Sequence, residues 1–158
     1  MTVATHTVSI NPAFLQEIKD DHHELRQLMH HAGAMLDRPN GMRVEYDRLV
    51  ELFLKLCDQL ALHFSLEEAY GYFEDAISVA PHLSRRAESL RAEHADLYSQ
   101  CCRQVESAER LLYHETPHVA LPRLAQEFRQ FSLQLHAHEA CECDLIVEAF
   151  HDDLGAGD

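Results

Sequence analysis

Apolar residues recur along this chain at alternating steps of three and four, which is the period of one face of an α-helix. Four such stripes follow one another, and no stretch shows the strict apolar–polar alternation that is typical of a half-buried strand. Proline marks the breaks, at Pro12, Pro39, Pro81 and Pro117. The pattern predicts four helices, over about residues 12–37, 43–78, 81–114 and 117–152.

Four long amphipathic helices with short connections favour an up-down-up-down antiparallel four-helix bundle, because each helix can then bury its apolar stripe against two neighbours. We therefore expect an all-α fold. A chain of 158 residues has the length of a single domain. We expect this domain to cover residues 12–152, with a short N-terminal extension at 1–11 and a C-terminal tail at 153–158.

Histidine and glutamate occupy stripe positions where a helical core should be apolar. These residues are His22, His63, Glu67, His94, His138 and Glu142. A single histidine on an apolar face is more often a hydrogen-bonded core residue than a metal ligand. An unpaired buried carboxylate, however, costs several kcal/mol or takes up a proton. Six such groups in one core need a common partner, and a metal ion is one that imidazole and carboxylate share.

The six residues lie in a sequence that repeats itself. Asp21-His22-His23-Glu24-Leu25 recurs as Glu93-His94-Ala95-Asp96-Leu97, 72 residues later. His63-Phe64-Ser65-Leu66-Glu67 recurs as His138-Glu139-Ala140-Cys141-Glu142, 75 residues later. The two residues of each His-x-x-x-Glu pair lie on one face of a helix. Counted from the connecting turns, antiparallel packing brings all six groups to nearly one height in the bundle.

A carboxylate one helical turn from an imidazole can bridge to a second ion, so the set predicts a dinuclear site. We expect His22 and His63 on one metal, His94 and His138 on the other, and two bridging carboxylates. The bridging residues are Glu67 and Glu142. Four imidazoles and two carboxylates suit iron best among the common metals, and manganese or a mixed metal pair is the alternative.

Taken in order, these motifs resemble those of the hemerythrin-like proteins, specifically the branch with the HHE cation-binding domain. The motifs are Asp21-His22-x-x-Leu25, His63-x-x-x-Glu67-Glu68, Glu93-His94-x-x-Leu97 and His138-x-x-x-Glu142. The resemblance covers about residues 14–150. It implies a hemerythrin-like bundle with two iron ions joined by an oxo or hydroxo bridge. Such a centre binds or reacts with O₂, peroxide or nitric oxide, or serves iron handling and sensing.

The chain departs from the oxygen-carrying hemerythrins in two places. Their third helix has a His-x-x-x-His pair, whereas Leu90 and Tyr98 stand four residues before and after His94. Their fourth helix has His-x-x-x-x-Asp, whereas residue 143 is Cys143. The departures disfavour reversible O₂ carriage and favour redox turnover or looser metal retention. Tyr98 is a less favoured candidate for the missing ligand.

Charged residues next to the predicted ligands are expected to be ordinary helix-surface charge. They are Glu68, Glu139 and Asp144. A hydrogen bond to the N–H of a ligand imidazole is the less favoured alternative for each of them.

Composition restricts the partners. The formal charge of −14 disfavours nucleic acid and anionic membranes, which reward positive patches. No apolar run approaches the length of a membrane span, and the first residues lack the pattern of a signal peptide. The five cysteines are odd in number and clustered, so we expect reduced thiols and a cytoplasmic protein.

Two functions from different classes are consistent with these predictions. The first is a metal-binding protein that binds or senses O₂ or a related small molecule, or handles iron. The alternative is a di-iron enzyme acting on peroxide, nitric oxide or ferrous iron. A metal-free structural bundle is the least favoured hypothesis. The sequence leaves open whether the protein is an enzyme, and it identifies no protein partner.

Overall fold

The computed structural model describes residues 12–37, 45–69, 76–78, 80–113 and 117–155. Its elements are α1 (Pro12–Leu36), α2 (Tyr46–Ala69), the 3₁₀ helix η1 (Pro81–Leu83), α4 (Ser84–Tyr113) and α5 (Pro117–Gly155). None of the described residues lies in a strand, and the predicted all-α class is confirmed. Within the described ranges, no helix combines the length and the apolar character needed to cross a membrane.

The helix bounds agree with the predicted segments at most ends. α1 ends one residue earlier than predicted, where the N–H of Asp37 donates to the carbonyl oxygen of Gly33 at 2.9 Å. The third segment starts at Pro81 as one 3₁₀ turn before the α-helix begins, and α5 continues to Gly155. Of the predicted second helix, residues 70–75 lie outside the described residues.

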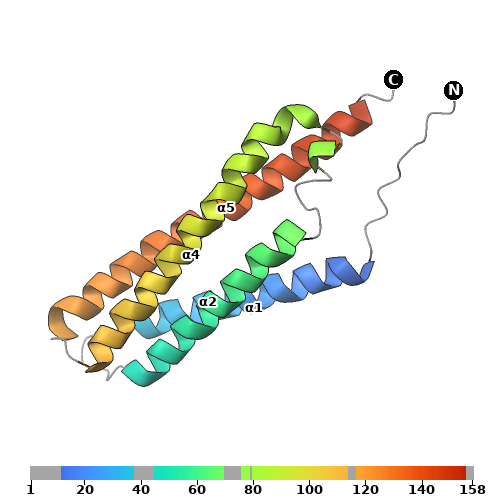
Figure 1. Cartoon of the computed structure of the whole chain (residues 1–158). Helices are drawn as coiled ribbons and strands as arrows, with labels where there is room; N and C mark the ends of the chain where they lie inside the picture. Colours follow the sequence, from blue (N-terminus) through green and yellow to red (C-terminus); the bar gives the residue numbers. More distant parts are fainter. Residues whose placement is uncertain (1–11, 38–44, 70–75, 79, 114–116, 156–158) are drawn as a thin grey trace, which may run out of the picture.

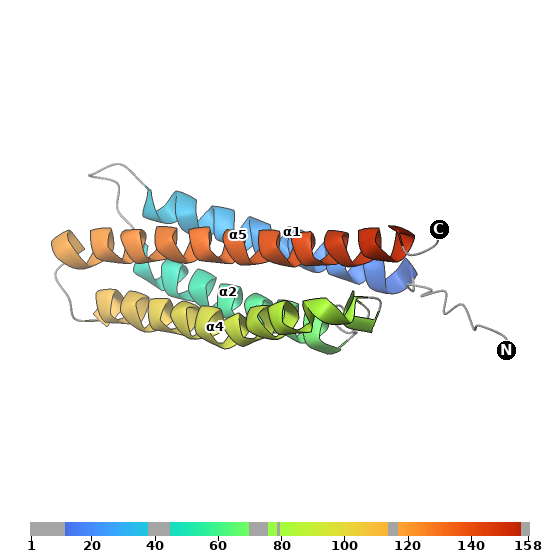
Figure 2. The ribbon, with the colours of Figure 1, turned by 90° about the horizontal axis from the view of Figure 1, so that it is seen from above.

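The four long helices lie alongside one another (Figures 1 and 2), with α1 and α4 each packed against both α2 and α5. Contacts between α4 and α5 join Arg86 to Glu148 and Glu93 to His138, so residue numbers fall on one helix as they rise on the other. These two helices are therefore antiparallel. Cross-helix contacts show that two further pairs of helices are antiparallel. For α2 and α4 the contacts are Cys57–Cys101 and Glu68–His94. For α1 and α5 they are His22–Glu139 and Asp37–Arg129.

Two separate hydrophobic clusters form the core. The larger one draws on all four long helices and includes Leu60, Leu97 and Leu135. The smaller one includes Leu90 and Leu145. On α4 and α5, the residues between these two clusters are His94, His138 and Glu142. The stripe thus continues through a polar layer that has apolar side chains on both sides.

The buried face of each helix follows the predicted stripe closely but not completely. On α4 the steps of three and four residues that pass through His94, Cys101 and Val105 lead to Leu112, but the buried residue near the end of the helix is Leu111. Gln104, which the stripe does not include, is also buried, and its side-chain oxygen has no hydrogen-bond partner. Nothing in the described residues explains this glutamine.

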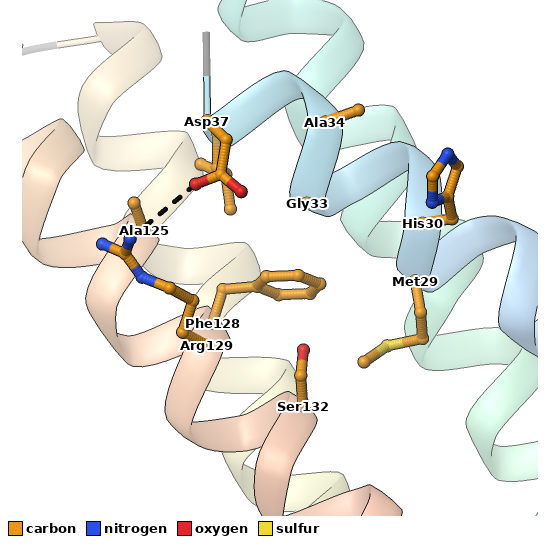
Figure 3. A pocket seen from close by; sticks show the side chains of 10 residues that line it. Met29, His30, Gly33, Ala34, Asp37, Ala125, Phe128, Arg129 and Ser132 are labelled. Atoms are coloured by element: carbon orange, nitrogen blue, oxygen red, sulfur yellow. Dashed lines mark ion pairs between the residues drawn. The ribbon is translucent and has the colours of Figure 1, made fainter.

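A groove of about 400 Å³ lies between α1 and α5, near the end of the larger cluster. Figure 3 shows the ring of Phe128 on α5 reaching toward Gly33 and Met29 on α1. Asp37 and Arg129 face each other at its edge, 3.8 Å apart. The groove contains none of the predicted metal ligands.

Candidate metal centre

Five of the six predicted ligands are buried in the polar layer. Their exposed fractions are 4% or less: His63 1%, Glu67 4%, His94 4%, His138 2% and Glu142 2%. The sixth, His22, lies at the edge, where 29% of its side chain is exposed. The i, i+4 spacing places both residues of each His-Glu pair on the inner face of α2 or α5, as predicted.

One group of potential ligand atoms comes from Glu67, His94, His138 and Glu142, and these atoms all lie within 4.8 Å of one another. Glu142 Oε1 is 2.9 Å from His138 Nε2 and 3.3 Å from His94 Nε2. Glu67 Oε2 is 3.5 Å from His94 Nε2. Two imidazoles and two carboxylates from three helices therefore converge on one point.

A second group consists of His22, His63 and Glu139, whose potential ligand atoms also lie within 4.8 Å of one another. The rings of His22 and His63 meet edge to face, with centroids 4.8 Å apart. Glu67 connects the two groups, because its Oε1 lies 3.0 Å from His63 Nε2 while its Oε2 faces His94. A carboxylate with one oxygen toward each group has the arrangement that a bridging ligand needs.

Each buried histidine is held from outside by a carboxylate on the preceding long helix. Asp21 accepts a hydrogen bond from His63 Nδ1 at 2.6 Å, and Gln59 donates to the other oxygen of Asp21 at 2.7 Å. The same role falls to Glu68 for His94 and to Glu93 for His138, both at 2.8 Å.

Because the Nδ1 atoms of His63, His94 and His138 are used in this way, their Nε2 atoms point into the polar layer. This is how metal-ligating histidines are usually oriented, since the outer hydrogen bond fixes both the ring and its tautomer. Asp21 and Glu93 were not predicted in this role, although both belong to the repeated motifs. For Glu68 a surface charge was the favoured interpretation, and the bond to His94 shows the less favoured one instead.

The signal that could have identified these carboxylates is their place in the chain. Asp21 precedes His22, Glu68 follows Glu67, and Glu93 precedes His94. Each is thus the neighbour of a predicted ligand.

Without a metal, the carboxylates of the polar layer raise the pKa of two of its histidines, His63 and His138, and so favour their protonated forms. Burial lowers the pKa of His63, but its bond to Asp21 and the nearby carboxylate of Glu67 outweigh burial and raise that pKa to about 10. The pKa of His138 is also raised, because Glu142 and Glu93 outweigh the effect of burial. Burial works to raise the pKa of Glu142, yet the imidazoles of His138 and His94, both within 3.3 Å of its Oε1, lower it to about 2.

For His22 and Glu67, the effect of burial on the pKa is larger than the effect of the neighbouring charges. Burial, assisted by the charge of His63, lowers the pKa of His22, so its imidazole is neutral and keeps a free lone pair near neutral pH. Burial raises the pKa of Glu67 in spite of the neighbouring His63. A positive ion beside Glu67 would favour its ionised form.

Several buried polar atoms in this layer have no hydrogen-bond partner. They are His22 Nδ1, His63 Nε2, Glu67 Oε2 and His138 Nε2. His63 Nε2 and His138 Nε2 lie within 3.0 Å of carboxylate oxygens one turn along the same helix, but these contacts lack the alignment of a hydrogen bond. More than about nine in ten buried polar groups in folded proteins are paired. Four unpaired ones in a single layer fit a cation-binding centre, because one ion can satisfy several of them.

Aromatic and apolar side chains enclose the layer. The ring of Phe64 stacks on His94, with centroids 4.1 Å apart and planes 8° from parallel. The layer is nevertheless close to the surface on one side. A groove of about 470 Å³ is lined by His138 together with Glu93 and Gln134. Small molecules can therefore approach the outer edge of His138 between α4 and α5.

The structure bears on three further expectations for residues near the ligands. Tyr98, the less favoured candidate for a ligand, is 40% exposed, and its hydroxyl hydrogen-bonds with Cys102. Glu139 was expected to be surface charge, but only 16% of its side chain is exposed and it lies in the second group. That expectation is wrong because the helix turns Glu139 toward α1. Asp144 is exposed as expected.

Comparison with protein-family models, with curated proteins and with solved structures found no match to this chain. The resemblance to hemerythrin-like proteins therefore stays a prediction from the sequence motifs. Function has to be inferred from the geometry of the described residues.

Proposed function

We propose that this protein binds two metal ions, iron by preference, in an up-down-up-down four-helix bundle of the hemerythrin-like kind. His22 and His63 hold one ion, and His94 and His138 hold the other. Glu67 bridges the two. Glu142, predicted from the sequence as the second bridge, has its close contacts with His94 and His138, and we assign it to their ion. The observation that carries the proposal is the group of buried, unpaired nitrogen and oxygen atoms in a layer between two hydrophobic clusters.

The donor set supports iron over the other common metals. Calcium and magnesium prefer sites built mainly from oxygen, and structural zinc prefers four tight ligands, often thiolates. The five cysteines are free, and none of them belongs to either ligand group among the described residues. Imidazole with carboxylate suits iron, and it also accommodates manganese or a mixed pair.

A bound iron pair would supply Lewis acidity and redox equivalents to O₂, peroxide or nitric oxide. The protein's own contribution is to hold the ligands in place and to limit access by water. Asp21, Glu68 and Glu93 keep the histidine rings turned inward, and the leucine layers on either side keep the centre dry. We propose that the protein binds or senses such a small molecule, or handles iron.

A di-iron enzyme is the second candidate, and one observation favours it. The hydroxyl of Tyr98 bonds with Cys102, so in this proposal the ion at His94 and His138 has four protein groups, Glu67, His94, His138 and Glu142, and no further histidine. Open positions on a metal favour turnover of peroxide, nitric oxide or ferrous iron over reversible binding.

Metal content tests the centre. Protein loaded anaerobically with ferrous iron and then desalted should contain about two irons per chain, and His63→Ala or Glu142→Ala should lower that number sharply. His136→Ala, an exposed histidine on the same helix as Glu142, is the control and should keep both ions. Full occupancy in both site variants would contradict the assignment.

Exposure of the ferrous protein to air separates the two functions. A stable coloured species that reverses when oxygen is removed supports binding or sensing. Irreversible oxidation, followed by turnover of added peroxide, supports the enzyme.

A further inference from the structure

One hydrogen bond of the polar layer occurs at equivalent positions in both halves of the repeated sequence, so the surroundings of the two metal positions can be compared residue by residue. The bond between Asp21 and His63 corresponds to the bond between Glu93 and His138, because the repeat offsets relate both residues of each pair. The repeat thus predicts what should surround His22, since its counterpart is His94.

The surroundings of His22 break this symmetry at two positions. His94 is held from outside by Glu68, but the residue equivalent to Glu68 is Cys143, which is exposed. His94 is also covered by the stacked ring of Phe64, and the residue equivalent to Phe64 is Glu139. Where one half places an aromatic ring against a histidine, the other half places a carboxylate.

Glu139 is positioned as a ligand and not as a hydrogen-bond partner. Its Oε1 lies 3.8 Å from His22 Nδ1, which is too long for a hydrogen bond, and that nitrogen is buried without a partner. Two ligand atoms that each lie about 2.0–2.2 Å from one ion are up to about 4 Å apart. The spacing of Glu139 and His22, with His63 in the same group, therefore fits side chains that share an ion.

We propose that Glu139 is a further metal ligand, on the ion held by His22 and His63, so that the two ions have different surroundings. The inference rests on the proposed dinuclear centre. In this arrangement Glu139 and Glu142 each serve one ion, and Glu67 lies between them. Glu142 has its close contacts with His94 and His138, which agrees with that division.

The division makes the ion at His22 the more loosely held of the two. His22 has 29% of its side chain exposed, whereas the side chains of His94 and His138 are at most 5% exposed. It also lacks the outer carboxylate that holds His94, because Cys143 takes that place. One ion is therefore firmly enclosed and the other can exchange.

Titration of the metal-free full chain with Co²⁺, followed by its absorption spectrum, tests the proposal. Wild type should bind two ions, one more tightly than the other. Glu139→Gln should leave the affinity for the first, tighter ion unchanged and weaken the affinity for the second ion about 10- to 100-fold. This is the range found when groups around a metal site are removed. Asp144→Asn, an exposed carboxylate on the same helix, is the matched control and should change neither step.

A double-mutant comparison separates a ligand from a residue that acts through His22. If Glu139 binds the ion itself, the double variant His22→Ala/Glu139→Gln should bind the weaker ion less tightly than His22→Ala does. Equal affinity in these two variants would overturn the proposal, as would wild-type binding by Glu139→Gln. Circular dichroism of each metal-free variant checks that the helices are intact.

Failure of the inference differs from failure of the proposed function. If wild type binds two ions and Glu139→Gln binds both as tightly, the inference alone is wrong. If wild type binds no Co²⁺ and no Fe²⁺, the dinuclear centre itself is wrong and Glu139 has no ion to hold.

Discussion

At the scale of single residues, Asp21 controls which nitrogen of His63 keeps its proton when the ring is neutral, the form in which imidazole binds a metal. Its Oδ2 accepts from His63 Nδ1 and its Oδ1 accepts from Gln59, so both oxygens are used. An asparagine at this position has one oxygen only. If that oxygen keeps the bond from Gln59, the amide NH₂ faces His63 Nδ1 and favours the tautomer whose proton sits on Nε2.

We therefore expect Asp21→Asn to weaken metal binding about 10- to 100-fold without unfolding the protein. Equilibrium titration with Co²⁺ measures the loss, and circular dichroism reports whether the helices remain. Glu24→Gln removes a charge from an exposed position on the same helix and serves as the control. Unchanged affinity in Asp21→Asn would mean that the bond to His63 does not set the tautomer.

The sequence could identify the inward-facing residues of the centre but not all of their outer partners. His63, His94 and His138 stand in the apolar stripes, where a polar residue is conspicuous. Asp21 and Glu93 are one residue away from a stripe position, which turns them about 100° around the helix toward a neighbouring helix. From the sequence alone that direction looks the same as solvent, because the identity of the adjacent helix depends on packing.

At the scale of helices, Gly33 is a weak point of α1. Glycine inside a helix costs about 0.5–1 kcal/mol relative to alanine. A Cβ added there would have Phe128 Cε1 as a neighbour at 3.6 Å, an ordinary van der Waals distance, so alanine fits without a clash. We expect Gly33→Ala to raise the free energy of unfolding by about 0.5–1 kcal/mol.

Urea unfolding followed by circular dichroism measures this change. Ala34→Gly is the reciprocal control, since Ala34 is exposed on the next position of the same helix and should lose a similar amount. Destabilisation by Gly33→Ala would show that the close contact between α1 and α5 needs a residue without a side chain.

Helix positions were more predictable than the details of each buried face. The proline at the start of α1, η1 and α5 gives a direct sequence signal, since proline is tolerated in the first turn of a helix. The burial of Leu111 in place of Leu112 has no such signal. Over the long α4 a helix of 3.6 residues per turn drifts away from a regular stripe, and packing decides which leucine turns inward.

At the scale of the whole molecule, the polar layer interrupts what would otherwise be a continuous core. In the metal-free protein, protons take part of the role of the ions. The pKa of His63 is raised from 6.5 to about 10, so the folded protein keeps a proton that the unfolded chain loses. The stabilisation that this provides is complete below pH 6.5 and is lost as the pH rises through 10.

Glu142 limits the stability of the metal-free protein at low pH, by the same linkage between a shifted pKa and folding. Its pKa is lowered from 4.5 to about 2, so its contribution is present above pH 4.5 and is lost as the pH falls through 2. As far as these two groups decide it, the metal-free protein is most stable between about pH 4.5 and 6.5. His138 acts in the same direction as His63, because its pKa is also raised.

Bound metal should change this dependence on pH. A cation at the centre competes with the proton on His63 Nε2, and so binds more tightly as the pH rises toward about 9. We expect the urea midpoint of the metal-free protein, kept in a chelator, to fall between about pH 6 and pH 9, and that of the metal-loaded protein to fall less or to rise. The variant His63→Gln has no proton to lose in this range, so its metal-free midpoint should fall less than that of wild type. Equal midpoints at both pH values in metal-free wild type would mean that protonated histidines do not stabilise the polar layer, and that the layer tolerates its unpaired groups in some other way.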